Sequence, residues 1–158
     1  MTENVIIIPT RLEATRLPNK PLKKINNKEM ILHVYDAAKN ADIGEVIVAS
    51  PNDQIFELIS SVKGICVKTK SNHKTGTDRI FEVFDKFLGK KPKIIINLQG
   101  DMPNIEPNAI KMLAKYMQKN LCDIATLAGQ FKDDFEIKDK NNVKVQTKEI
   151  LSNNQFKQ

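Results

Sequence analysis

Short runs of β-branched residues alternate with amphipathic segments along almost the whole chain. The runs are typical of strands covered on both faces, and the segments between them place apolar residues at helical spacing. The strand candidates are 5–8, 45–49, 65–69, 93–98, 123–127 and 143–146. The helix candidates are 30–41, 53–62, 77–88 and 107–119. This alternation predicts a three-layer α/β/α sandwich, with a mostly parallel sheet and helices on both of its faces.

The same pattern makes more local predictions. The run at 93–98 is the most apolar one, so we expect it to be the central strand. Thr77, followed by Asp78, is expected to cap the helix 77–88. The helical spacing of Phe81, Phe84 and Phe87 predicts that these rings lie in the core.

Composition favours one globular domain over residues 1–158. The chain is 41% hydrophobic and 28% charged, and it is long enough to bury a substantial core. No apolar run approaches the roughly 20 residues that cross a bilayer, and no basic segment precedes the first one, so we expect a cytoplasmic protein without membrane contact. Cys66 and Cys122 lie in apolar runs, which favours buried thiols over a disulfide. With only two histidines in addition, a zinc site is not expected.

In a parallel α/β sheet, the ligand site lies beyond the carboxyl ends of the strands. The loops 9–21, 70–77 and 99–103 follow three of the candidate strands. The chemistry of the protein is therefore expected in these three loops.

The loop 9–21 carries Arg11, Arg16 and Lys20 and is stiffened by three prolines. Arginine binds phosphate oxygens through its planar fork and lysine supplies a point charge, so these cations suit a triphosphate and the charge on departing pyrophosphate. The first glycine of the chain is Gly44, which argues against the glycine-rich phosphate and dinucleotide loops. A solvated basic loop is the alternative, but three cations after the first strand favour a phosphate site.

Asp101 follows the run at 93–98, at a position where a Mg²⁺ ion that bridges phosphate oxygens would need a carboxylate ligand. The alternative is a tight turn over 99–101 in which Asp101 bonds to local amides. The position after the predicted central strand favours the metal.

The loop 70–77 precedes a helix whose first amides can bind an anion or a base carbonyl. Ser71, His73, Gly76 and Thr77 are the candidates for contacts to a nucleoside. Helix capping by Thr77 is an equally supported interpretation of this segment.

Four segments of the chain then carry a family resemblance. They are Val5–Arg11 (VIIIPTR), Thr15–Leu22 (TRLPNKPL), Gly76–Arg79 (GTDR) and Asn97–Pro103 (NLQGDMP). In this order they resemble the motifs of the 3-deoxy-manno-octulosonate (Kdo) cytidylyltransferases, also called CMP-Kdo synthetases. The resemblance covers nearly the whole chain. It implies the nucleotide-diphospho-sugar transferase fold, which is Rossmann-like and of the GT-A type.

The resemblance also implies a reaction. The anomeric hydroxyl of Kdo would attack the α-phosphate of CTP, giving CMP-Kdo and pyrophosphate for lipopolysaccharide biosynthesis. Mg²⁺ is the implied cofactor, with Asp101 as its ligand, and the implied catalytic residues are Arg11, Arg16, Lys20 and Asp101. The residues expected to bind the nucleotide are Pro9, Thr10, Arg11, Arg16, Lys20, Ser71, His73, Gly76, Thr77 and Gln99.

Members of this family are longer than this chain and form homodimers, and their later portion supplies most contacts to the sugar acid and a second metal-binding aspartate. We therefore expect the C-terminal part of the fold to be missing from this chain, and CTP binding to be better preserved than turnover.

Two other hypotheses remain. One is another nucleotidyltransferase of the same fold, which activates a different sugar or alcohol. The other is a basic domain that binds RNA, in keeping with the net charge of +6 from 25 lysines and arginines against 19 acidic residues. Because the chain lacks a basic helix and clustered exposed aromatic residues, no nucleic-acid partner is expected.

Overall fold

The computed structural model describes residues 4–13, 17–89, 91–119 and 122–146. Contacts group the chain into two units, residues 1–125 and residues 126–158. The single domain predicted over 1–158 therefore stays a prediction, and each unit is described by itself. None of the helices in the described ranges combines the length and the apolar character that crossing a membrane requires.

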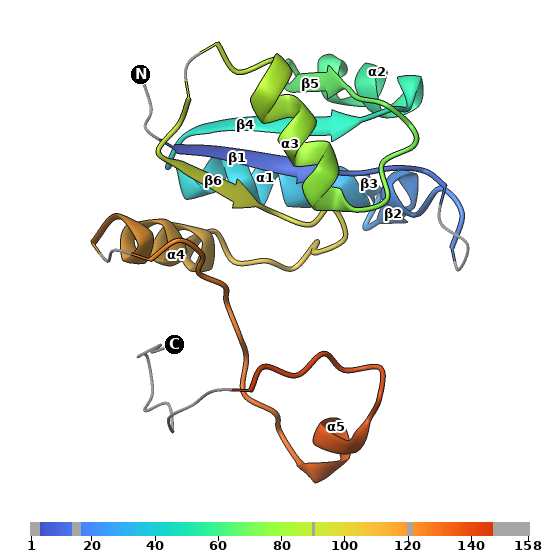
Figure 1. Ribbon diagram of the computed structural model, residues 1–158. Coiled ribbons are helices and arrows are strands. Elements are labelled where there is room, and N and C mark those ends of the chain that lie inside the picture. The colour runs from blue at the N-terminus through green and yellow to red at the C-terminus, as the bar shows by residue number, and fades with distance from the viewer. Residues whose placement is uncertain (1–3, 14–16, 90, 120–121, 147–158) are drawn as a thin grey trace. The chain divides into compact units, whose positions relative to one another are not determined.

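The larger unit is built on a four-stranded sheet in the order β5-β4-β1-β6, with every neighbouring pair parallel (Figure 1). Its strands are β1 (Asn4–Pro9), β4 (Glu45–Ser50), β5 (Ile65–Lys68) and β6 (Ile94–Asn97). The helices of this unit are α1 (Met30–Ala41), α2 (Asp53–Ser61), α3 (Gly76–Lys86) and α4 (Pro107–Lys119). A 3-10 helix η1 (Lys20–Leu22) leads into a small hairpin of β2 (Lys24–Ile25) and β3 (Lys28–Glu29).

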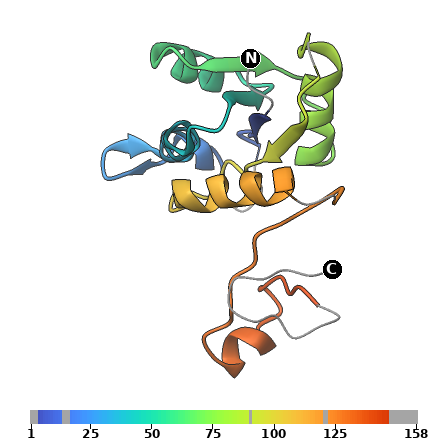
Figure 2. The same ribbon diagram turned by 90° about the vertical axis from the view of Figure 1, so that its left-hand side faces the viewer.

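Different helices cover the two faces of the sheet. Ile6 and Ile8 of β1 point to the face on which α1, α2 and α4 pack, whereas Val5 and Ile7 point to the face of α3. All four side chains are at most 3% exposed. Figure 2 shows the sheet between α3 and α1. The three-layer α/β/α sandwich with a parallel sheet, as predicted from the sequence, is thereby confirmed.

The prediction that the run at 93–98 forms the central strand is wrong. The run gives β6, which ends the sheet among the described residues, while β1 lies between β4 and β6. Ile94 and Ile95 are only half-buried, because an edge strand is covered less completely than an inner one. High apolar content therefore did not distinguish the edge from the centre.

The start of α3 also differs from the prediction. The cap is Thr75 and not Thr77, because the Thr75 hydroxyl accepts a hydrogen bond from the Asp78 amide at 3.1 Å. The Asp78 carboxylate in turn accepts one from the Thr75 amide at 3.1 Å. This reciprocal pair satisfies two amides at once, which a cap at Thr77 would not.

The aromatic residues of α3 do not form the core that was predicted for them. Phe81 is 63% and Phe87 51% exposed, and Phe84 is half-buried. Ile80 and Val83 are the residues that face the sheet. Residues 81, 84 and 87 also have helical spacing, so the pattern alone admitted two faces and the wrong one was chosen.

Cys66 and Cys122 are free thiols, as predicted, although each is half-buried rather than fully buried. Cys66 packs against the core, and burial raises the pKa of its thiol to about 11. The Cys66 thiol is therefore protonated at neutral pH and a poor nucleophile.

The strands predicted at 123–127 and 143–146 are not formed, since the backbone of both segments is irregular. Ile124 is 73% and Val143 91% exposed. A β-branched run becomes a strand only where a neighbouring strand pairs with it, and a sequence pattern does not provide that neighbour. Among residues 126–146 of the smaller unit, the short helix α5 (Asp134–Lys138) forms, and the Asp133 carboxylate caps it by accepting a hydrogen bond from the Glu136 amide at 2.9 Å.

Candidate functional site

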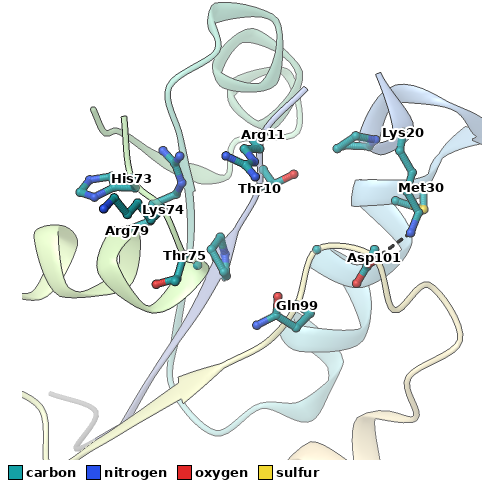
Figure 3. Close-up of a pocket in the computed structure, with 14 residues that line it drawn as sticks. Thr10, Arg11, Lys20, Met30, His73, Lys74, Thr75, Arg79, Gln99 and Asp101 are labelled. Atoms are coloured by element: carbon teal, nitrogen blue, oxygen red, sulfur yellow. Dashed lines mark hydrogen bonds and ion pairs between the residues drawn. The ribbon is translucent and has the colours of Figure 1, made fainter. Parts of the chain in front are cut away.

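A pocket of about 340 Å³ lies at the carboxyl ends of β1 and β6 (Figure 3). Most of its lining comes from three segments: the end of β1 and the residues after it, the residues that follow β6, and the segment that enters α3. Lys20 and Pro21 of η1, Met30 of α1 and Arg79 of α3 also line it. This is the end of a parallel sheet at which ligand sites are expected.

Most of the residues singled out from the sequence meet in this pocket. Those that line it are Pro9, Thr10, Arg11, Lys20, His73, Gly76, Gln99 and Asp101. Ser71 is not part of the lining, and Thr77 lines a neighbouring pocket on the outer side of α3. Arg16 lies outside the described residues.

Two glycines let the three segments pack closely. A Cβ atom on Gly100 would lie 3.2 Å from both the Pro9 carbonyl oxygen and the Thr10 Cβ. A Cβ atom on Gly76 would lie 3.2 Å from Pro9 Cγ. Because both distances are tighter than ordinary van der Waals contacts, glycine at these positions lets the loops after β6 and before α3 lie against the end of β1.

Arg79 lines the pocket and was not singled out from the sequence as a site residue. Its side chain is only 3% exposed, and its guanidinium donates hydrogen bonds to the Thr69 hydroxyl and, at 3.0 Å, to the Lys70 carbonyl. Among the described residues it forms no ion pair. Burial lowers the pKa of Arg79 and the charge of Arg11 lowers it further, while the charges of Glu13 and Glu82 act in the opposite direction. A buried cation without a paired carboxylate is suited to an anion in the pocket.

A signal for Arg79 was present in the sequence. Arg79 stands next to Ile80 on the stripe of α3 that faces the sheet, where a cation is unexpected. A charge in such a position needs a partner, and a ligand is one candidate. The signal was missed because the stripe was assigned to the phenylalanines.

His73 is held by a buried carboxylate. Glu82 on α3 accepts hydrogen bonds from His73 Nε2 at 2.5 Å, from the Lys70 amide at 2.9 Å and from Lys86 Nζ at 3.3 Å. Burial raises the pKa of Glu82, but these three hydrogen bonds outweigh it and lower the pKa to about 2. The segment from Lys70 to His73 is thereby tied to α3 at two points.

The opposite side of the pocket is more open. Lys20 Nζ lies 2.9 Å from Asp101 Oδ2, and the two side chains are 37% and 56% exposed (Figure 3). Asp101 is the one carboxylate among the residues that line the pocket. The described residues contain no group of three or more side chains that could hold a metal ion. Mg²⁺ is commonly bound through one or two carboxylates together with substrate phosphates, so Asp101 fits an ion that arrives with a phosphate ligand and not a resident ion.

The comparison with protein families shows to which family the chain belongs. A family model described as cytidylyltransferase matches residues 5–157. The chain belongs to this cytidylyltransferase family.

Within the family, the chain is similar to proteins named 3-deoxy-manno-octulosonate cytidylyltransferase. It is 37% identical over 156 residues to the one from Bartonella henselae, and the match covers 98% of this chain and 64% of that protein. It is 40% identical over 140 residues to the one from Photorhabdus laumondii, and this match covers 89% of this chain and 56% of that protein. The chain thus spans between half and two thirds of the length of these relatives.

Solved structures agree with the fold. A structure of CMP:2-keto-3-deoxy-manno-octonic acid synthetase complexed with CTP matches 74% of this chain and 48% of its own, with a TM-score of 0.69 and 39% identity. A structure of a cytidylyltransferase from Leptospira borgpetersenii matches with a TM-score of 0.64 at 19% identity. This match covers 77% of this chain and 51% of that chain, and it supports the fold alone. The cytidylyltransferase chain described here therefore has the nucleotidyltransferase fold that the resemblance implied.

Proposed function

We propose that this chain binds CTP and belongs to an enzyme that transfers the cytidylyl group to Kdo, giving CMP-Kdo and pyrophosphate. The observation that carries the proposal is the pocket in which Arg11, Lys20 and Arg79 meet the single carboxylate of Asp101. The names of the relatives and the CTP complex of the similar structure support CTP and Kdo as substrates.

The cations of the pocket would hold the triphosphate. Arg11 and Arg79 offer planar forks that match phosphate oxygens, and Lys20 and Lys74 add point charges (Figure 3). In phosphoryl transfer, positioning and charge neutralisation make up most of what a protein contributes. Arg16, as inferred from the sequence, belongs to the same proposed set.

Asp101 would act together with Lys20. With the nucleotide bound, Lys20 would exchange its ion pair with Asp101 for a phosphate oxygen, and the Asp101 carboxylate would become available to Mg²⁺. The ion would neutralise charge on the phosphate oxygens and orient the α-phosphate for attack. Lys20 and Asp101 are therefore each expected to contribute to binding, Lys20 through a phosphate oxygen and Asp101 through Mg²⁺.

Gln99 would contact the base. Its Nε2 donates to the Asn97 carboxamide oxygen at 2.7 Å, which orients the amide and turns Oε1 to the side of Gly76. An oxygen in this place can accept a hydrogen bond from the exocyclic amino group of cytosine, which uracil lacks. Preference for CTP over UTP is the expected consequence.

Titration calorimetry with CTP, ATP, GTP and UTP, each with Mg²⁺ and with EDTA, tests the proposal. We expect selective, Mg²⁺-dependent binding of CTP that is strongly weakened but still measurable in Arg11→Ala, and weakened in Asp101→Ala. Lys39→Ala, which removes an exposed lysine of α1 outside the pocket lining, is the control and should bind as the unchanged chain does. Equal affinity for all four nucleotides would contradict the proposal, and selectivity for another nucleotide would favour a different nucleotidyltransferase of the same fold.

The wider assignment is part of the same proposal. It comprises Kdo as the acceptor, a role in lipopolysaccharide biosynthesis and a homodimeric enzyme, which the family resemblance implies, together with the cytoplasmic location expected from the sequence. Kdo-dependent release of pyrophosphate from CTP is the assay for the acceptor. Release that other sugar acids stimulate equally well would contradict Kdo as the substrate.

A further inference from the structure

The side chain of Asn52 makes hydrogen bonds that its position does not call for. Asn52 is the N-cap residue of α2, and asparagine is among the residues that best cap a helix with their side chain. Its side chain nevertheless forms no cap hydrogen bond to α2. It points to the loop that follows β1.

Both ends of the Asn52 carboxamide are bonded to this loop. Its Oδ1 accepts a hydrogen bond from the Leu12 amide at 3.1 Å, and its Nδ2 donates one to the Glu13 carboxylate at 2.7 Å. The main chain of Asn52 is itself fixed, because its amide donates at 3.2 Å to the hydroxyl of the fully buried Ser50. The carboxamide therefore ties the loop to the end of β4.

The hydrogen bonds of the Asn52 side chain lie directly beside Arg11 in the chain. On one side of Arg11, the Thr10 amide donates to the Ala49 carbonyl at 3.0 Å. On the other side, Leu12 is held by Asn52 and its side chain is buried in the core. Thr10 and Leu12 are thus held and buried on either side of Arg11, which is itself exposed and lines the pocket.

Glu13 fixes the orientation of the Asn52 carboxamide. Because the Glu13 carboxylate can only accept, it selects the Nδ2 end of the carboxamide and leaves Oδ1 for the Leu12 amide. The hydrogen bond from Asn52 lowers the pKa of Glu13, and the charges of Arg11 and Arg79 lower it further. Glu13 is thus ionised in the neighbourhood of both pocket arginines.

We propose that Asn52 is a positioning residue, which holds the backbone at Leu12 so that Arg11 faces the phosphates of the bound nucleotide. The ligand in this statement rests on the function proposed above. Asn52 itself does not line the pocket, so it acts on the nucleotide through Arg11 and not by contact.

A double-mutant cycle tests the proposal. CTP with Mg²⁺ is titrated into the unchanged chain, Asn52→Ala, Arg11→Ala and the double variant. We expect Asn52→Ala to weaken binding by about tenfold, and the double variant to bind no more weakly than Arg11→Ala, because a misdirected Arg11 contributes nothing that its removal can take away. Asn108→Ala, on an exposed residue of α4 outside the lining, is the control and should bind normally. Independent, additive losses would overturn the proposal, since a general loss of structure does not act through Arg11.

A rescue variant separates positioning from mere stability. In Asn52→Asp combined with Glu13→Gln, the amide introduced at position 13 can donate to the carboxylate introduced at position 52. The other oxygen of that carboxylate still accepts from the Leu12 amide, and the net charge of the chain is unchanged. Binding within about threefold of the unchanged chain is expected for this pair, whereas Asn52→Asp alone places two carboxylates against each other and should bind weakly. Failure of the pair to recover any affinity would overturn the proposal.

Hydrogen exchange keeps the result distinct from the function proposed above. The Leu12 amide should exchange at least several-fold faster in Asn52→Ala, while the Thr10 amide, bonded to Ala49, should not change. If the unchanged chain fails to bind CTP, the proposed function is wrong and this readout alone decides the inference. Unchanged exchange at Leu12 would overturn it.

Discussion

The pocket has two sides that are built in opposite ways. On the α3 side, Arg79 and Glu82 are buried and each is held by more than one hydrogen bond. On the other side, Lys20 and Asp101 are substantially exposed and held by one ion pair. Figure 3 shows the two sides facing each other across the pocket, with Arg11 between them.

The difference concerns both energy and function. A buried charged group contributes strongly to stability through its hydrogen bonds and is costly to remove, whereas an exposed ion pair contributes little because water screens it. The α3 side is therefore formed before the nucleotide arrives. The side of Lys20 and Asp101 can exchange partners when the nucleotide binds, and the two sides should respond differently to substitution.

The largest effect is expected on the α3 side at Arg79. Arg79→Met should lower the free energy of unfolding by about 2 kcal/mol, because it leaves the Lys70 carbonyl and the Thr69 hydroxyl without their buried donor. It should also abolish measurable CTP binding. Urea unfolding and calorimetry measure the two effects. Lys74→Met is the control, since it removes the same charge from an exposed pocket residue and should leave the free energy of unfolding nearly unchanged. Equal destabilisation by both substitutions would show that the burial of Arg79 does not contribute to stability.

The next largest effect is a pH dependence that belongs to Glu82. Its pKa is about 2 in the folded chain against the usual 4.5, so the carboxylate stabilises the fold above about pH 4.5 and this contribution is lost as the pH falls toward 2. In Glu82→Gln the urea midpoint should change less with pH over this window than in the unchanged chain. Glu57→Gln removes an exposed carboxylate of α2 and is the matched control, which should keep the original pH dependence. A Glu82→Gln variant with that same dependence would show that the three hydrogen bonds do not hold the carboxylate ionised.

The two sides of the pocket were not equally predictable from the sequence. Arg11 and Asp101 follow directly from where strands end, because residues just beyond parallel strands gather at one edge of the sheet. Lys20 was predicted from the cluster of cations in the loop 9–21. Arg79 depends on which face of α3 points inward, and the helical spacing of Phe81 and Phe84 suggested the opposite face. The first residue of α3 was missed for a related reason, since Thr75 and Thr77 are both able to cap and only the reciprocal bond with Asp78 selects between them.

The sequence pattern predicted the class of fold, but it did not predict which of the β-branched runs would pair into the sheet. The β-branched run of β1 predicted a strand covered on both faces, and its residues are buried in the structure. The runs at 94–97 and 123–127 were both predicted as strands, yet one pairs with β1 and the other is irregular. Pairing depends on residues far away in the sequence, and no local pattern contains that information.

The smallest effect on stability is expected at the exposed ion pair of Lys20 and Asp101. Lys20→Met should change the free energy of unfolding by less than about 1 kcal/mol, because the pair with Asp101 is exposed and screened. Binding of CTP with Mg²⁺ should nevertheless weaken clearly, since the variant lacks a cation at the phosphates and leaves Asp101 without its partner before the nucleotide arrives. Urea unfolding and calorimetry on the same preparations measure both quantities. A Lys20→Met variant that is as destabilised as Arg79→Met would mean that the two sides are built alike, and one that binds CTP normally would remove Lys20 from the proposed site.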